Sequence, residues 1–575
     1  MMKPRLVPGR VCLALAMAVL AAVSLAQGAS IAPLYTFTNT FPGGGVDGGT
    51  PVGGLIQASN GVLYGTTLNG GTNNGYGTIF KVTTDGVFTP LYTFTSSTTD
   101  GSTPYAGLLQ GTNGNFYGTC YGGGTNAYGS IYRLTGAGAF SELYGFNRLR
   151  GAAYTNAEGA NPNAALVQGT NGNFYGTAPA GGTNGFGAAF EITAAGALTK
   201  LHIFTNGPDG ANPGALFQSV NGLIYGTTTN GGSNGFGAIY KMTSIGVLTP
   251  LYSFTNGTDG AHPGPALVQA NNGILYGTCS GGGSNNTGTI FQITTNGVFA
   301  PLYSFASSGV AGLGLATNAD GLYPGPLVPA GNNSYYGFTE LGGQNGTGTI
   351  FQFSPSTGLT TLYSFLVGSL SGNYTITNTA GAEPTSLLLE TNGTLYGTAK
   401  TGGASSFGTI FQLGLPPQIT SQPTSLSLAL GSTSRFTLGA SVTSCQWQFN
   451  GTNLPGATNL TLTNLNAQAA NAGPYQAVVS NGFGSVTSSV ACLNLTNVPA
   501  SIASSPSAMQ YSGGLFTLLV TNLTGQGTII LESSSDMKTW TPLATNPPAY
   551  GPLPFTDPNA TNSAHFYRAR IVPGP

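Results

Sequence analysis

One acidic residue recurs in a short turn motif along the first part of the chain. The motif reads acid-Gly-x-x-Pro, and Ala380 replaces the acid in a seventh copy. Carboxylates gathered on one surface could bind a cation or the hydroxyl groups of a glycan. The alternative is structural: each carboxylate caps a turn by accepting backbone N–H bonds, and this is favoured because nearly every copy has it. The acids are Asp47, Asp100, Glu158, Asp209, Asp259 and Asp320.

Aromatic residues recur in a second motif, the loop that follows each Tyr-Gly string. Their rings could stack on sugars, but wedging between neighbouring repeats is the favoured interpretation. The six acids and these aromatics together are the candidate ligand-binding residues. Thr287 and Thr347 replace the aromatic in two copies, and the aromatics are Tyr76, Tyr128, Phe186, Phe236 and Phe407.

Catalysis has little support in the residue pattern. The three histidines, His202, His262 and His565, form no metal-ligand spacing and no Ser-His-Asp set. Two acids from different repeats could converge as a glycosidase pair. The sequence therefore predicts a non-catalytic protein, with a carbohydrate-active glycosidase or lyase as the alternative. No cofactor is expected, and calcium is retained only as a secondary hypothesis because one acid per repeat supplies few ligands.

These motifs belong to a repeat with a period of 50 to 60 residues. Tyr-Gly pairs begin at seven tyrosines, and each repeat contains four strand-like pieces. Piece a is Leu-Tyr-x-Phe (34–37), b is a short apolar run (107–110), c is Leu-Tyr-Gly-Thr and d is Thr-Ile-Phe-Lys-Val-Thr (78–83). The seven tyrosines are Tyr64, Tyr117, Tyr175, Tyr225, Tyr276, Tyr336 and Tyr396.

Spacing indicates which pieces pair. The distance from d to the next a is constant, 12 residues from Phe80 to Tyr92, which predicts a tight hairpin within one sheet. The link from a to c varies from 23 to 33 residues, as expected where the chain crosses between sheets. The chain starts with an unpaired a piece and ends its last repeat without one. We therefore predict an all-β fold with a seven-bladed β-propeller over residues 31–414, closed by the N-terminal strand.

The Asn-Gly-x-Leu-Tyr-Gly-Thr and Gly-Gly-x-x-x-x-Gly-Thr-Ile-Phe strings resemble the GloVer-type (Gloeobacter/Verrucomicrobia) tandem repeat, found in exported bacterial proteins. The resemblance covers about residues 31 to 414. It implies a propeller-like fold and no established reaction, so it transfers no catalytic residues.

Two further β modules are expected after the repeats. Residues 416–497 resemble a bacterial immunoglobulin-like domain, in which Trp447 is the core tryptophan and Tyr475 forms the tyrosine corner. Leu438 and Ala477 stand at about the positions of the usual cysteines, so the inter-sheet disulfide is absent. Residues 498–575 are expected to form a small C-terminal β-sandwich-like module.

Cysteine positions suggest two different roles. Cys120 and Cys279 occupy the same position in two repeats and are expected to be buried small side chains. Cys445 and Cys492 fall in one domain, and the sequence leaves open whether they form a disulfide.

Composition and the first residues indicate location and partners. Residues 1–26 are expected to be a signal peptide, leaving no membrane span, so the protein is predicted to be secreted or at the cell surface. Charged residues are 5% of the chain, and the net charge of −1 argues against nucleic acid as a partner. We expect an adhesion or recognition protein that binds an extracellular glycan or a surface protein. A purely structural surface or matrix protein is a further alternative.

Overall fold

The computed structural model of the chain describes residues 30–572, except for 39–45, 73–74, 152–153, 311–314, 332, 368, 372–374, 391–392, 442–443, 482–483, 497–500, 503–508, 513–514, 522, 524–527, 548–551 and 558–565. The predicted signal peptide and His565 lie outside the described residues. Two compact units fall within residues 27–415 and 416–575. The described residues form strands, one 3-10 turn and no α-helix, so the predicted all-β fold is confirmed. None of the described helical structure is long and apolar enough to cross a membrane.

Seven antiparallel sheets of four or five strands, numbered in chain order, make up most of the described part of the first unit. Sheet 1 contains β2 (Ile56–Gln57), β3 (Leu63–Thr67), β4 (Thr78–Val82) and β5 (Phe88–Thr93). Sheet 2 contains β6 (Leu109–Gln110), β7 (Phe116–Cys120), β8 (Ser130–Leu134) and β9 (Phe140–Gly145). Sheet 3 contains β10 (Val167–Gln168), β11 (Phe174–Ala178), β12 (Ala188–Ile192) and β13 (Leu198–Ile203). Sheet 4 contains β14 (Ala211–Gln218), β15 (Ile224–Asn230), β16 (Ala238–Met242) and β17 (Leu248–Ser253).

In sheets 5 and 6 the first strand is split in two. Sheet 5 contains β18 (Ala261–Pro263), β19 (Val268–Gln269), β20 (Leu275–Gly281), β21 (Thr289–Ile293) and β22 (Phe299–Ser304). Sheet 6 contains β25 (Leu322–Pro324), β26 (Val328–Gly331), β27 (Ser334–Leu341), β28 (Thr349–Ser354) and β29 (Gly358–Ser364). Sheet 7 contains β32 (Ala382–Leu389), β33 (Leu395–Thr401), β34 (Thr409–Gly414) and β1 (Ser30–Thr36).

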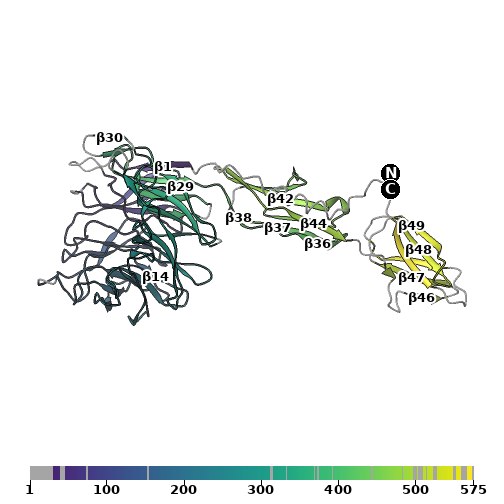
Figure 1. Cartoon of the computed structure of the whole chain (residues 1–575), viewed down its shortest axis with the longest axis horizontal. Helices are drawn as coiled ribbons and strands as arrows, with labels where there is room; N and C mark the ends of the chain where they lie inside the picture. The colour runs from purple at the N-terminus through teal and green to yellow at the C-terminus, as the bar shows by residue number, and fades with distance from the viewer. Residues whose placement is uncertain are drawn as a thin grey trace. The chain divides into compact units, whose positions relative to one another are not determined.

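Every sheet therefore has the predicted strand order b-c-d-a. The prediction that the N-terminal strand completes the last repeat is confirmed, because β1 pairs antiparallel with β34 and places Tyr35 opposite Ile410. Figure 1 draws β1 in purple within the first unit. Insertions in the a–b links form two small hairpins, β23 (Gly309–Val310) with β24 (Ala316–Thr317) and β30 (Ser369–Ser371) with β31 (Thr375–Thr377).

Each hydrophobic core of this unit lies between two consecutive sheets. Ile79 and Phe94 of the first repeat share a cluster with Phe116 and Leu134 of sheet 2. Five further clusters join the following pairs in the same way. The seventh cluster joins sheet 7 to sheet 1 through Tyr396 and Phe80 among others. Both faces of each inner strand are consequently covered, and all five residues of β3 are buried.

The second unit contains two groups of strands. The first comprises β35 (Gln418–Ser421), β36 (Leu426–Ala429), β37 (Ser434–Thr437), β38 (Gly439–Ser441), β39 (Ser444–Phe449), β40 (Thr452–Asn453), β41 (Thr461–Asn464), the 3-10 turn η2 (Ala469–Asn471), β42 (Gly473–Asn481), β43 (Gly484–Thr487) and β44 (Ala491–Thr496). The second comprises β45 (Ser501–Ile502), β46 (Met509–Ser512), β47 (Leu515–Thr521), β48 (Thr528–Ser534), β49 (Thr541–Asn546), β50 (Leu553–Asp557) and β51 (Phe566–Val572).

Trp447 anchors the core of the first group. Its ring is fully buried, and its Nε1 donates to the Asn459 carbonyl at 2.9 Å. The Tyr475 hydroxyl donates to the Asn471 carbonyl at 2.8 Å, which is the contact of a tyrosine corner. Leu438 and Ala477 are buried in the same hydrophobic cluster as Trp447.

Candidate functional site

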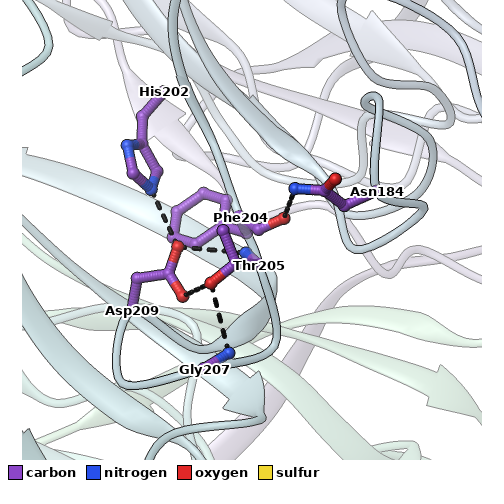
Figure 2. Close-up of polar contacts among 6 residues, drawn as sticks. All are labelled: Asn184, His202, Phe204, Thr205, Gly207 and Asp209. Atoms are coloured by element: carbon purple, nitrogen blue, oxygen red, sulfur yellow. Dashed lines mark hydrogen bonds and ion pairs between the residues drawn. The ribbon is translucent and has the colours of Figure 1, made fainter.

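Asp209 shows how one recurring acid is placed (Figure 2). Strand β13 ends just before a short turn, and the Thr205 N–H donates to Asp209 Oδ2 at 3.0 Å. The Thr205 hydroxyl donates to the other carboxylate oxygen, and His202 Nε2 lies 3.0 Å from Oδ2. The carboxylate therefore fastens the turn to the end of its own strand.

The same arrangement recurs at the other acids, with a tyrosine where sheet 3 has His202. The backbone N–H that follows the buried phenylalanine donates to the carboxylate, as Thr255 does to Asp259 at 2.8 Å. Glu158 accepts the Asn147 N–H at 3.0 Å and faces Tyr144. The tyrosine hydroxyls donate at 2.7–3.3 Å in the pairs Tyr35–Asp47, Tyr92–Asp100, Tyr252–Asp259 and Tyr303–Asp320.

Burial of these pairs raises the pKa of their tyrosines. All six acids are buried, with 2–8% of each residue exposed. Burial and the Glu158 carboxylate raise the pKa of Tyr144 to about 12, and the pKa values of Tyr35, Tyr92, Tyr252 and Tyr303 are raised for the same reasons. The hydroxyls therefore stay protonated as hydrogen-bond donors at neutral pH. This geometry favours turn capping over ligand binding for the acids. Among the described residues no three His, Cys, Asp or Glu side chains gather as a metal site.

An asparagine two residues before the acid shares this task in three repeats, and the sequence reading did not single it out. In the seventh repeat, where Ala380 replaces the acid, Asn378 Oδ1 accepts the Gly381 N–H at 2.7 Å and its Nδ2 donates to the Leu366 carbonyl. Asn156 and Asn318 make equivalent bonds beside Glu158 and Asp320. The signal that could have identified them is an asparagine two residues before the first position of the turn motif in these three repeats.

The five loop aromatics are half-buried. Four of them pack on the core that their own sheet shares with the next sheet in the chain, and Phe407 packs on the core that sheet 7 shares with sheet 1. Their carbonyls accept N–H bonds from the residue before the proline of the next acid motif. The His262 N–H donates to the Phe236 carbonyl at 2.9 Å. The Thr50 N–H donates to Phe407 at 2.8 Å, joining sheet 1 to sheet 7. The structure thus brings each acid turn against the aromatic loop of the preceding sheet. In the three remaining bonds of this kind the N–H groups of Thr103, Asn161 and Asn212 donate to the carbonyls of Tyr76, Tyr128 and Phe186, respectively.

The residue before the motif proline has an unusual backbone conformation in all seven repeats. Its φ lies between 51° and 58°, although it precedes a proline and is β-branched in two copies. The inter-sheet hydrogen bond accompanies this conformation in six of these residues: Thr50, Thr103, Asn161, Asn212, His262 and Glu383. The seven residues are Thr50, Thr103, Asn161, Asn212, His262, Tyr323 and Glu383.

The motif proline packs on a glycine of the preceding sheet. A Cβ added to Gly237 would lie 2.4 Å from Pro263 Cδ and 2.5 Å from the Thr228 carbonyl, and its φ is +100°. Only glycine fits there. The other six prolines approach the equivalent glycines in the same way: Pro51, Pro104, Pro162, Pro213, Pro324 and Pro384.

A further polar bond between sheets comes from the threonine of Tyr-Gly-Thr. The Thr227 hydroxyl donates to the Gly264 carbonyl of the next sheet at 2.8 Å, and four other copies do the same. In sheet 6, Phe338 replaces this threonine; its ring lies against Gly325, where a Cβ would be 2.1 Å from the ring.

The cysteines occupy buried positions. Cys120 and Cys279 are free and fully buried beneath the acid-Gly turns, as predicted, and burial raises the pKa of both thiols. Cys445 is also a free, buried thiol, so it forms no disulfide with Cys492.

The sequence profile of the Gloeobacter/Verrucomicrobia repeat matches residues 29–157 and 152–325. No curated protein is significantly similar to the chain in sequence. Among solved structures, a triple arginine-to-alanine mutant of AofleA from Arthrobotrys oligospora matches at 11% identity with a TM-score of 0.32, covering 54% of this chain and 81% of that chain. The N-terminal Ig1-2 module of the Drosophila receptor protein tyrosine phosphatase DLAR matches at 20% identity with a TM-score of 0.13, covering 18% of this chain and 64% of that module.

Proposed function

The chain belongs to the Gloeobacter/Verrucomicrobia repeat family, and we propose that it is an exported recognition protein whose repeats form a seven-bladed β-propeller. The shared core and the Thr50–Phe407 hydrogen bond between sheets 7 and 1 support a closed ring. Residues 1–26 would direct export, residues 416–497 would form an immunoglobulin-like sandwich, and residues 498–575 a second sandwich. These two modules would act as a spacer or a second contact.

The contrast between recurring and variable residues favours recognition over catalysis. Residues that recur in nearly every repeat are buried in contacts within or between sheets, including the six acids. Side chains that differ between repeats stand beside them on what we call the loop face, formed by the a–b links and the c–d loops. A surface that varies on a constant scaffold is typical of a binding face.

The class of ligand follows from the scarcity of charge. With 5% charged residues and a net charge of −1, the surface offers mainly hydroxyl, amide and aromatic groups. Such groups suit an extracellular glycan, or a surface protein, better than a highly charged partner. The buried acids leave few carboxylates to serve as a glycosidase pair, so we propose a non-catalytic role.

Two assays on the purified full chain test this function. We expect binding on a glycan array, or capture of a surface protein from intact bacterial cells, without release of sugar products. Turnover of a polysaccharide that is lost in both Asp209→Asn and Asp259→Asn, while the variants stay folded, would overturn the non-catalytic proposal. Binding to neither glycans nor cells would favour a purely structural role.

A further inference from the structure

Among the described residues of the loop face, two exposed aromatic rings lie next to each other. Tyr105 and Tyr121 are 43% and 42% exposed, and their ring centroids lie 5.7 Å apart with the ring planes tilted by 59°. Tyr105 lies in the link that enters sheet 2, and Tyr121 lies in the c–d loop of the same sheet. The recurring loop aromatics, by contrast, are half-buried between sheets.

The backbone holds both tyrosines in place. Tyr105 follows buried Pro104 and precedes Ala106, whose carbonyl accepts the Thr66 hydroxyl of sheet 1. The Tyr121 N–H donates to the Thr103 carbonyl at 3.1 Å, and the Tyr121 carbonyl accepts Nδ2 of Asn161, from the link to sheet 3, at 2.8 Å. Contacts from three neighbouring repeats therefore fix the two tyrosines, so ordering these loops on ligand binding would cost little conformational entropy.

Comparison of the repeats indicates that the fold does not require either ring. A residue with a structural role would recur at the same position in other repeats, as the acids and prolines do. The residues equivalent to Tyr105 are Val52, Asn163, Gly214, Gly264, Gly325 and Thr385. Those equivalent to Tyr121 are Leu68, Pro179, Thr229, Ser280, Glu340 and Lys400. Only the second repeat places an aromatic residue at both positions.

The surroundings of the pair favour an uncharged ligand. No charged residue occurs in the chain between Asp100 and Arg133, Asp100 is buried in its own turn, and Glu142, which contacts the c–d loop of the pair, is bonded there to Thr125. The faces of a neutral sugar ring present C–H groups that pack on the negative face of an aromatic ring, while tyrosine hydroxyls and nearby amides can bond its hydroxyl groups.

We infer that Tyr105 and Tyr121 form a subsite for a neutral sugar unit of an extracellular polysaccharide. This inference rests on the recognition function proposed above and names the surface that performs it. The second ring, tilted against the first, would contact the neighbouring sugar unit or the edge of the same one.

Binding of neutral hexasaccharides to the full chain tests the subsite. The probes are cellohexaose, xylohexaose, mannohexaose and laminarihexaose, with polygalacturonate as an acidic comparison, measured by calorimetry or affinity electrophoresis. Tyr105→Asn and Tyr121→Ser introduce residues that other repeats carry at the same positions, so folding should be retained. Each should weaken binding of a neutral hexasaccharide by at least about tenfold, as removal of an aromatic anchor from a small contact does.

Tyr323→Asn is the matched control, because Tyr323 is 51% exposed in the acid motif of another repeat and Asn212 occupies its position in sheet 4. It should leave the affinity unchanged. Binding of a neutral hexasaccharide that survives both test substitutions would refute the subsite and leave glycan recognition standing. Failure of the unmodified chain to bind any of the four neutral probes would also overturn the inference, and capture of polygalacturonate or a surface protein would then show that recognition itself survives.

Discussion

Two tyrosines of sheet 4 provide a matched test of how hydroxyl groups act in the repeat. Tyr240 on β16 is fully buried, and its hydroxyl has no hydrogen-bond partner among the described residues. Tyr252 on β17 donates its hydroxyl to Asp259 at 3.0 Å. Replacing each by phenylalanine removes one oxygen atom from the same sheet, so the two variants differ mainly in the bond that is lost.

Only Tyr252→Phe is expected to lower the free energy of unfolding. An unsatisfied buried hydroxyl costs about 1–3 kcal/mol, so Tyr240→Phe should leave the free energy of unfolding unchanged or raise it by up to about 1 kcal/mol after a small packing loss. The small void is tolerable, because five other repeats already have phenylalanine at this position: Phe80, Phe190, Phe291, Phe351 and Phe411. Tyr252→Phe loses a hydrogen bond to a carboxylate and should lower the free energy of unfolding by about 1.5–3 kcal/mol.

Scanning calorimetry of the full chain measures both variants. The two tryptophans, Trp447 and Trp540, lie in the second unit, so tryptophan fluorescence identifies the transitions of residues 416–575 and leaves the remaining transition to the repeats. For a unit of this size we expect a shift of about 1–2 °C per kcal/mol. If Tyr240→Phe lowered the repeat transition as much as Tyr252→Phe, the Tyr240 hydroxyl would have a partner such as a buried water, and the reasoning would be wrong.

Three further predictions concern the contacts between sheets, the tyrosines and the thiols. Gly237→Ala, where the new Cβ meets Pro263, should lower the free energy of unfolding by more than about 2 kcal/mol, whereas Gly235→Ala, with positive φ but open space around it, should cost about 1 kcal/mol in the same calorimetric measurement. The pKa of Tyr144 is raised from 10.0 to about 12, so the stability from its protonated hydroxyl is complete below about pH 10 and lost as the pH rises through about 12. Between about pH 10 and 12 the unfolding midpoint of the chain should therefore fall more than that of a Tyr144→Phe variant, which lacks the titrating hydroxyl, and equal falls in the two would contradict the buried pairing. The buried thiols Cys120 and Cys279 should resist alkylation in the folded chain and react after unfolding, as mass spectrometry of labelled peptides would show.

Local patterns in the sequence were sufficient for the strands and their pairing within each sheet. The constant spacing between d and a predicted the β4–β5 type of hairpin, and the unpaired first strand predicted the pairing of β1 with β34. These features are readable because hairpin turns and the alternation of side chains depend on neighbouring residues. The recurrence of the acids likewise indicated a task that every repeat shares.

What the acid motif contacts was decided only by the tertiary structure. The residues from Asp259 to Pro263 predict a turn. In the structure the His262 N–H donates to the Phe236 carbonyl, and Pro263 packs on Gly237, both in the preceding sheet. No local rule predicts a positive φ immediately before proline, because the conformation is held by a neighbouring sheet rather than by the residue itself.

The same division applies to the candidate site. The sequence by itself determined the repeat, its strand order and the scarcity of charge. It placed the recurring acids and aromatics among the ligand-binding candidates, since recurrence draws attention to them. The structure places them in buried or half-buried contacts and leaves Tyr105 and Tyr121 exposed together. The two rings lie close because the segments around Ser102 and Tyr121 pair within sheet 2, and both this pairing of distant segments and the exposure of the rings are set by the tertiary structure rather than by neighbouring residues.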